Sequence, residues 1–264
     1  SQFSRSEFGS MKFCSEKDIE KVINGEEVKS KISVMVDIGR VDPSTIPQKS
    51  GSLIDMMRVA SYVKDIDKAI DLANQIKTKG YEATINLMAV SHARERELDE
   101  ALMQVEKESN IDALYLVDSF GALYSEQISH LAQKYKSLMP TKEIGIHAHN
   151  NQQLAFANTI EAIIQNINYL DGTIFGIGRA AGNCPLELLL GFLKNPKYDL
   201  RPILEILESH FVTLREEIEW GYTIPYMITG ILDLHPRAGM KLRKSESKDD
   251  YLGFFDSLAQ SDSA

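Results

Sequence analysis

Six short runs of apolar and β-branched residues recur along this chain of 264 residues, and helical patterns separate them. The runs cover residues 31–39, 53–60, 81–90, 111–119, 143–150 and 169–178. Their starts lie roughly 22 to 32 residues apart, which is the length of one strand, one helix and two turns. The pattern therefore predicts an α/β fold with parallel strands.

The segments between the runs carry apolar stripes of helical period. The clearest stripe recurs three and four positions apart at Ile66, Ala69, Ile70, Ala73 and Ile76, as expected for a helix packed on a sheet. Beyond residue 185 the strand pattern stops and helical patterns take over. We therefore predict a barrel-type catalytic domain over residues 1–195, a helical C-terminal extension over 196–240 and a polar tail over 241–264.

Repeated strand and helix units fit either a doubly wound open sheet or a (β/α)8 barrel. A dinucleotide-binding open sheet should carry G-x-G-x-x-G directly after its first strand. The nearest pattern, "GIGRAAG" at residues 176–182, has three residues instead of two before its last glycine and comes at the last run instead. A glycine pattern in that place is weak evidence for a dinucleotide.

Composition and charge exclude several classes of function. The net charge is −9 and the isoelectric point is about 5.2, which argues against a nucleic-acid surface because phosphate binding needs clustered Lys and Arg. No apolar stretch approaches the ~20 residues that span a bilayer, and the chain start lacks a secretory signal pattern. Two cysteines give no disulfide framework. We expect a soluble, cytoplasmic protein that binds no nucleic acid and no membrane.

Polar residues gather where the predicted strands end, and the fifth run, "EIGIHAHN", ends in two histidines. Residues two apart on a strand point to the same face about 6 to 7 Å apart, so His147 and His149 can reach one metal ion. Imidazole together with carboxylate and amide oxygens suits Mn, Mg, Co or Zn. Two satisfied histidines at a polar strand end are the alternative.

Other strand ends carry further candidates. Asp118 and Ser119 close "LYLVDS" and can cap the following helix, or orient a ligand histidine and hold a substrate carboxylate. Arg58 in "DMMRV" needs an anion if it points inward, and the alternative is a buried salt bridge to Asp118 or Asp37. Asn86 is a candidate substrate contact or a brace of the barrel interior.

Three motifs in order, "VDSFG", "GIHAHNN" and "GIGRAAGNCPLE", resemble the DRE-TIM metallolyases. This (β/α)8 superfamily includes hydroxymethylglutaryl-CoA lyase, isopropylmalate and citramalate synthases, and 4-hydroxy-2-oxovalerate aldolase. The resemblance runs from about residue 31 to 190. The "WGYTIPYMITG" segment at 220–230 is similar to the helical region that follows the barrel in the aldolase branch.

The resemblance implies functions for particular residues. His147 and His149 would bind a divalent cation, Mn or Mg first and Co or Zn as alternatives, and Asn183 would complete or support its shell. Arg58 and Ser119 would lie near the 2-oxo acid end of the substrate. Tyr226 and His235 are the candidates in this chain for the base that moves the proton of the aldol hydroxyl.

The sequence departs from the family at its start. The Asp-x-Thr-Leu-Arg-Asp-Gly type segment of the first strand, which supplies a metal-binding Asp and an Arg in the family, is not found in this chain. The six runs would then be strands three to eight of the barrel. We expect a fragment of a longer protein, and the alternative is a family member that lacks the metal-binding Asp.

The implied activity is a divalent-metal-dependent aldolase or lyase that forms or cleaves a carbon–carbon bond through a pyruvate-type enolate of a 2-oxo acid. Two alternatives stay open: an acyl-CoA-dependent Claisen condensing enzyme, and a non-catalytic barrel that has lost its metal. A homodimer formed through the helical C-terminal region is expected. An aldehyde dehydrogenase partner, known for some aldolases of the family, is the less favoured expectation.

Overall fold

The computed structural model describes residue 6 and residues 9–261, so the ends of the predicted barrel domain and tail (1–5, 7–8 and 262–264) lie outside the described residues. All six predicted strands are present and parallel. They are β1 (Ser33–Asp37), β2 (Met56–Tyr62), β3 (Glu82–Met88), β4 (Ala113–Asp118), β5 (Glu143–Ala148) and β6 (Tyr169–Leu170). The strand order in the sheet is β1-β2-β3-β4-β5-β6. Two 3-10 turns, Pro43–Thr45 and Lys49–Gly51, lie in the connection from β1 to β2, and an α-helix lies in each later connection.

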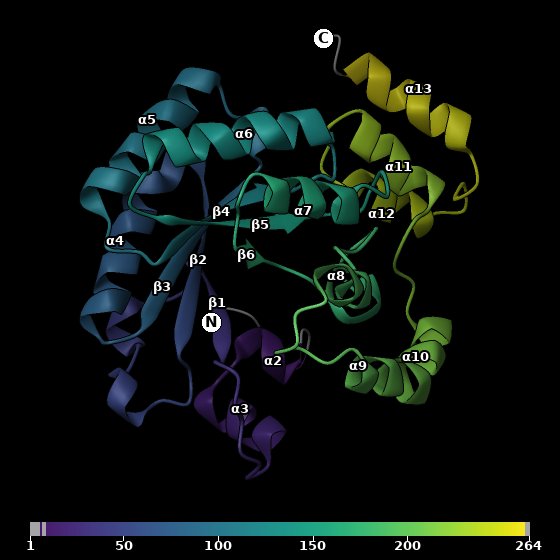
Figure 1. The fold of residues 1–264 in the computed structure, drawn as a ribbon. Coiled ribbons are helices and arrows are strands. Elements are labelled where there is room, and N and C mark those ends of the chain that lie inside the picture. Colours follow the sequence, from purple (N-terminus) through teal and green to yellow (C-terminus); the bar gives the residue numbers. More distant parts are fainter. Residues whose placement is uncertain (1–5, 7–8, 262–264) are drawn as a thin grey trace. The chain divides into compact units, whose positions relative to one another are not determined.

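The chain divides into two compact units. The first unit comprises residues 1–116 and 135–144, and includes α2 (Ser10–Phe13), α3 (Glu16–Ile23), α4 (Ile66–Thr78) and α5 (Glu95–Glu108). Helix α4 packs on β2 and β3 (Figure 1). The predicted apolar stripe of α4 is buried at every position, which confirms the helix and the face it presents to the sheet.

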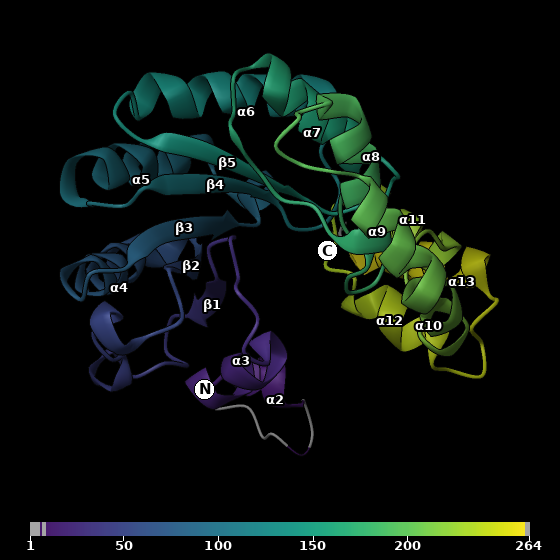
Figure 2. The same cartoon turned by 60° about the horizontal axis from the view of Figure 1, so that its bottom comes forward.

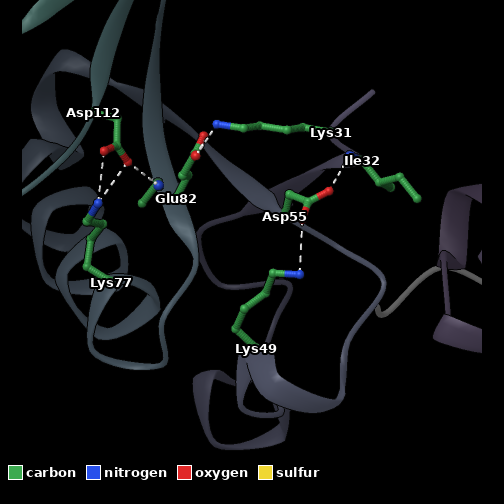
Figure 3. Close-up of polar contacts among 8 residues, drawn as sticks. Lys31, Ile32, Lys49, Asp55, Lys77, Glu82 and Asp112 are labelled. Atoms are coloured by element: carbon green, nitrogen blue, oxygen red, sulfur yellow. Dashed lines mark hydrogen bonds and ion pairs between the residues drawn. The ribbon is translucent and has the colours of Figure 1, made fainter. Parts of the chain in front are cut away.

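The N-terminal ends of the strands in this unit are tied together by ion pairs (Figure 3). Asp55, directly before β2, accepts a hydrogen bond from the backbone N–H of Ile32 at 2.8 Å and pairs with Lys49 at 3.0 Å. Asp112, directly before β4, repeats the arrangement: it accepts from the backbone N–H of Ala83 at 2.8 Å and from Lys77 at 2.9 Å. These contacts satisfy backbone groups at the strand starts. The residues at the N-terminal end of the sheet therefore stabilise the fold.

The second unit comprises residues 117–134 and 145–264. Its strands β5 and β6 pair in register, with Gly145 opposite Tyr169 and Ile146 opposite Leu170. Its first helices are α6 (Ser125–Leu138, whose last residues belong to the first unit), α7 (Ala155–Ile164) and α8 (Leu186–Leu193). Helix α7 buries Ala155, Asn158, Thr159 and Ala162.

The predicted strand over 169–178 is longer than the observed β6. Pairing with β5 ends at Leu170, and the chain then turns through a short 3-10 helix, Ile174–Gly176, in which Phe175 has a φ of 55°. Thr173 forms hydrogen bonds with the 184–186 segment instead of with a strand of the sheet. The glycine-rich sequence therefore forms a folded turn after β6.

The predicted helical C-terminal region is present. It contains α9 (Arg201–Ile206), a π-helical turn (Leu207–Phe211), α10 (Val212–Glu217), α11 (Ile224–Ile231) and α12 (Arg237–Arg243), and α13 (Tyr251–Ser261) lies within the stretch predicted as a polar tail. Helices α12 and α13 both pack against α11 (Figure 2). None of the described helices is long and apolar enough to cross a membrane. The domain boundaries and the dimer stay predictions.

Candidate metal centre

His147 and His149 lie at the C-terminal end of β5 and directly after it, and their rings are neighbours. The ring centroids are 4.9 Å apart and the ring planes are inclined by 77°. Both side chains project from the same side of the strand because they are two residues apart. The predicted H-x-H arrangement therefore brings two imidazoles to one place.

Asp171 fixes the orientation of His147. The Nδ1–H of His147 donates to Oδ2 of Asp171 at 2.8 Å, and both side chains are mostly covered, with exposed fractions of 25% and 18%. Asp171 follows β6 directly, and its backbone N–H donates to Ile146 of β5 at 3.1 Å. A carboxylate accepts only, so the bond places the proton on Nδ1 and the lone pair of His147 on Nε2.

A backbone carbonyl fixes His149 in the same tautomer. The Nδ1–H of His149 donates to the carbonyl oxygen of Asp118 at 2.9 Å, and the backbone N–H of His149 donates to the same oxygen at 3.3 Å. Burial, with a smaller contribution from the neighbouring His147, lowers the pKa of His149 to about 4. His149 is therefore neutral near pH 7, with its Nε2 lone pair available to a ligand.

Asn183 is the third candidate ligand, and backbone contacts hold it beside His149. Residues 149 and 183 form an antiparallel β-bridge, and the backbone N–H of Asn150 donates to Gly182 at 2.9 Å. The side-chain Nδ2 of Asn183 donates to the carbonyl of Ile177 at 3.0 Å. Because the amide nitrogen points to the backbone, the amide oxygen is the atom that Asn183 can offer to a cation.

Two glycines allow this placement of Asn183. A Cβ on Gly178 would lie 2.4 Å from Nδ2 of Asn183, and a Cβ on Gly182 would lie 2.1 Å from the carbonyl oxygen of Gly176. Gly182 also has a φ of +78°, a conformation that side chains disfavour. The "GIGRAAGN" segment therefore positions an asparagine side chain, and its glycine spacing serves that turn.

The donor set fits a divalent cation in part. Two imidazole nitrogens and one amide oxygen are ligands that Mn, Co and Zn accept, and water or substrate oxygens can complete the shell. Within the described part of the chain, no group of three or more His, Cys, Asp or Glu side chains is placed to hold a metal. His147, His149 and Asn183 would hold the cation, and no carboxylate is among these three residues.

The carboxylate of Asp118 caps the turn after β4. It accepts from the backbone N–H groups of Ala122 at 3.0 Å and Leu123 at 3.4 Å, which precede helix α6. The carboxylate therefore caps the turn before α6 and not the helix itself, and the backbone carbonyl of Asp118, not its acid group, orients His149. A contact of Asp118 with substrate stays a prediction. Burial raises the pKa of Asp118 to about 7, against the lowering effect of these hydrogen bonds. Ser119 follows it and is buried.

The two candidate bases, Tyr226 and His235, have different surroundings in the structure. The ring of Tyr226 packs in a buried cluster with Ala180 and Ala181. Burial, followed by the nearby carboxylate of Glu219, raises the pKa of Tyr226. The ring of His235 lies 5.7 Å from the ring of Phe120. Phe120 follows Asp118 by two residues, so His235 is the candidate with contacts close to the histidine pair.

Arg58 and Asn86 belong to the first unit, and they contact each other. The Nε–H of Arg58 donates to Oδ1 of Asn86 at 3.2 Å, and the guanidinium lies 4.1 Å above the ring of Tyr115. Asn86 is buried. These contacts from three adjacent strands hold Arg58 in place, as the bracing interpretation of Asn86 predicts. Their part in substrate binding stays a prediction.

Two residues of the centre did not stand out in the sequence. Asp171 belongs to the site because strand register sets it beside His147, whereas in the sequence it is only the third residue of the run predicted as a strand over 169–178. Arg179 lowers the pKa of both His149 and His235, so its charge lies close to both. Arg179 lies within the glycine-rich motif, but the motif gave no direction for its side chain.

Comparisons with known proteins identify the family of this chain. The family model described as HMGL-like matches residues 15–208, which is most of the chain, so this protein belongs to the HMGL-like family. A 4-hydroxy-2-oxovalerate aldolase from Thermus thermophilus is 31% identical over 159 residues, 59% of this chain and 46% of its own length. An oxaloacetate decarboxylase from Mycobacterium tuberculosis is 29% identical over 145 residues, 55% of this chain and 43% of its own. The chain thus spans less than half the length of these two relatives.

Solved structures agree with the family. The N-terminal domain of a proposed aldolase from Bacteroides vulgatus superposes with a TM-score of 0.77 and 28% identity, over 93% of this chain and 83% of that one. The HMG-CoA lyase of Bacillus subtilis superposes with a TM-score of 0.58 and 17% identity, over 76% and 75% of the two chains; at that identity it shows the fold alone. The predicted α/β fold of the TIM-barrel class, with a helical C-terminal region, is confirmed.

Proposed function

We propose that this protein is a divalent-metal-dependent carbon–carbon lyase that acts on a 2-oxo acid, as the aldolase relatives suggest. One observation carries the proposal: His147 and His149 are neighbours, and each has Nδ1–H bound to an acceptor that leaves Nε2 as a ligand atom. Two imidazoles fixed in this way on a strand end are a preorganised chelate. In the alternative, the two hydrogen bonds only satisfy the polar ring atoms and the pair binds no cation.

Different residues of the chain would bind the cation and the substrate. When bound, a divalent cation would supply Lewis acidity to the carbonyl of the 2-oxo acid. His147, His149 and the amide oxygen of Asn183 would hold that cation. Ser119, directly after Asp118 on the same strand end, would bind the substrate carboxylate.

The reaction we propose is a retro-aldol cleavage. The bond between C3 and C4 of a 4-hydroxy-2-oxo acid breaks, the C4 hydroxyl loses its proton, and C3 gains one, which yields pyruvate and an aldehyde. Oxaloacetate is the second candidate substrate, because a relative of similar identity is an oxaloacetate decarboxylase. The two reactions share pyruvate and differ in the second product, an aldehyde or carbon dioxide.

The experiment measures Mn²⁺ binding by calorimetry, and pyruvate and aldehyde release from a 4-hydroxy-2-oxo acid. It uses residues 1–264 and also any longer natural chain that contains them. His147→Ala with His149→Ala should abolish Mn²⁺ binding and product release. His210→Ala, an exposed histidine in the helical region, is the matched control and should change neither.

Mn²⁺ binding that depends on the two histidines, with aldehyde formed, supports the proposal. Carbon dioxide from oxaloacetate without any aldehyde would make the decarboxylation the function. A protein that binds no Mn²⁺ in either form would overturn the proposal and favour the non-catalytic barrel. Dependence of turnover on an acyl-CoA would instead favour the Claisen alternative.

A further inference from the structure

His235 has the opposite hydrogen-bonding arrangement to the two candidate ligand histidines. The backbone N–H of Arg237 donates to Nδ1 of His235 at 3.1 Å. A nitrogen that accepts a hydrogen bond from an N–H carries no proton, so the proton of the neutral ring lies on Nε2. His147 and His149 donate from Nδ1 and present the Nε2 lone pair, whereas His235 presents Nε2–H.

His235 also has a ring neighbour and an electrostatic link on the side of the centre. Its ring contacts Phe120, which follows the residue pair 118–119 at the end of β4, and the carbonyl of Asp118 is the acceptor for His149. The charges of His235 and Arg179 both act on His149, and the charge of Arg179 acts on His235 in turn. These three residues therefore form one electrostatic cluster in the second unit.

Burial is the first cause that lowers the pKa of His235, and the positive charges of Arg179 and Arg237 add to it. Asp233, two residues before His235, acts on the carboxylate of Asp118. The charged groups that act on His235 are thus the two arginines, and His235 acts in turn on the neutral His149. An imidazole in this setting is suited to donate a hydrogen bond without carrying a charge.

We propose that His235 is a neutral hydrogen-bond donor whose Nε2–H binds an oxygen of the substrate that carries or gains negative charge. The proposal rests on the proposed function and goes further, since it assigns His235 as a donor where the sequence suggested a base. A ring that already holds its proton on Nε2, with Nδ1 occupied, cannot accept another proton from substrate at either nitrogen without losing a bond. The ligand class is a planar 2-oxo acid anion or its enolate.

The tautomer is measured directly. Long-range ¹H–¹⁵N spectra of the metal-free protein distinguish protonated from unprotonated ring nitrogens of each histidine, and the His235→Asn variant assigns the signals. We expect Nε2–H at His235 and Nδ1–H at His147 and His149. Nδ1–H at His235 would overturn the proposal whatever the metal does.

Two variants of His235 distinguish the loss of its Nε2–H donor from the loss of its hydrogen bond with the backbone of Arg237. In His235→Asn the side-chain oxygen can still accept from the backbone N–H of Arg237, as asparagine does in turns, but the side chain is too short to replace Nε2–H. In His235→Gln the longer amide can place an N–H near the position of Nε2. The probe is oxalate, a planar dianion that resembles the enolate of pyruvate, titrated into the Mn²⁺-loaded protein.

We expect His235→Asn to weaken oxalate binding roughly tenfold or more, as loss of a hydrogen bond to a charged group predicts, and His235→Gln to retain most of it. Mn²⁺ affinity should stay within about threefold in both. Equal loss of oxalate affinity in the two variants, or none in either, would overturn the donor role. Absence of Mn²⁺ binding would overturn the proposed function, and with it the donor role, even if Nε2–H is observed.

Discussion

His147 and Asp171 face each other across two adjacent parallel strands, with Nδ1 of the imidazole 2.8 Å from the carboxylate. The pairing of Ile146 with Leu170 sets the next residue of each strand side by side. A carboxylate behind a histidine fixes the ring and raises the basicity of its other nitrogen. Strand register therefore sets the orientation and the tautomer of His147.

Asp171→Asn should weaken Mn²⁺ binding roughly 10- to 100-fold. The amide can accept the hydrogen bond but removes the negative charge, and it can also turn its N–H₂ towards the ring and favour the wrong tautomer. Calorimetry with Mn²⁺ measures the change, and urea unfolding checks that the fold is intact. The matched control is Asp199→Asn, an exposed residue. Unchanged affinity in Asp171→Asn would mean that the carboxylate does not orient a ligand.

Gly182→Ala should destabilise the second unit and weaken Mn²⁺ binding, whereas Gly191→Ala should do neither. A Cβ at Gly182 meets the carbonyl of Gly176 at 2.1 Å, and the backbone has a positive φ, so we expect a loss of roughly 1–3 kcal/mol. Gly191 lies in α8, and an added methyl group there would have no atom within 4 Å, so alanine should add about 0.5–1 kcal/mol of helix stability. Equal free energies of unfolding for the two variants, measured with urea, would contradict the inference that Gly182 is required for the turn.

Asp118 should make the folded protein less stable as the pH rises from about 4 to about 7. Its pKa in the folded state is raised to about 7, above the value of an unfolded chain, so the unfolded state releases its proton first and folding is favoured most below the unfolded pKa. Asp118→Asn should remove this slope. Urea unfolding of both proteins in EDTA at pH 5 and pH 8 tests it, with Asp71→Asn, exposed on α4, as the control that keeps the slope.

Asp112→Ala should lower the free energy of unfolding by about 1–2 kcal/mol. The change removes the acceptor for the backbone N–H of Ala83 and the partner of Lys77. Asp71→Ala, mid-helix and exposed, should change stability by less than about 0.5 kcal/mol. The measurement is urea unfolding at pH 7. Mn²⁺ binding should be unaffected in Asp112→Ala, because Asp112 stands at the opposite end of its strand from Asp118.

Much of the fold follows from local patterns. The six apolar runs and the stripe on α4 predicted the strands and a packed helix, because burial on one face imposes a period that each segment carries in its own residues. The run at 169–178 was wrong in its length, since β6 ends at Leu170. A glycine-rich run reads as apolar, yet it lacks the side chains that would hold it in a sheet.

That two histidines share one strand face follows from residue spacing alone, since side chains two apart on any extended chain point to the same side. Their hydrogen-bond partners depend on the folded chain. Asp171 reaches His147 through strand register, the carbonyl of Asp118 reaches His149 from the neighbouring strand end, and the backbone of Arg237 assigns the opposite tautomer to His235. Contacts of the first two kinds join residues more than twenty positions apart, and the third depends on a backbone turn, so residue identity alone does not specify them.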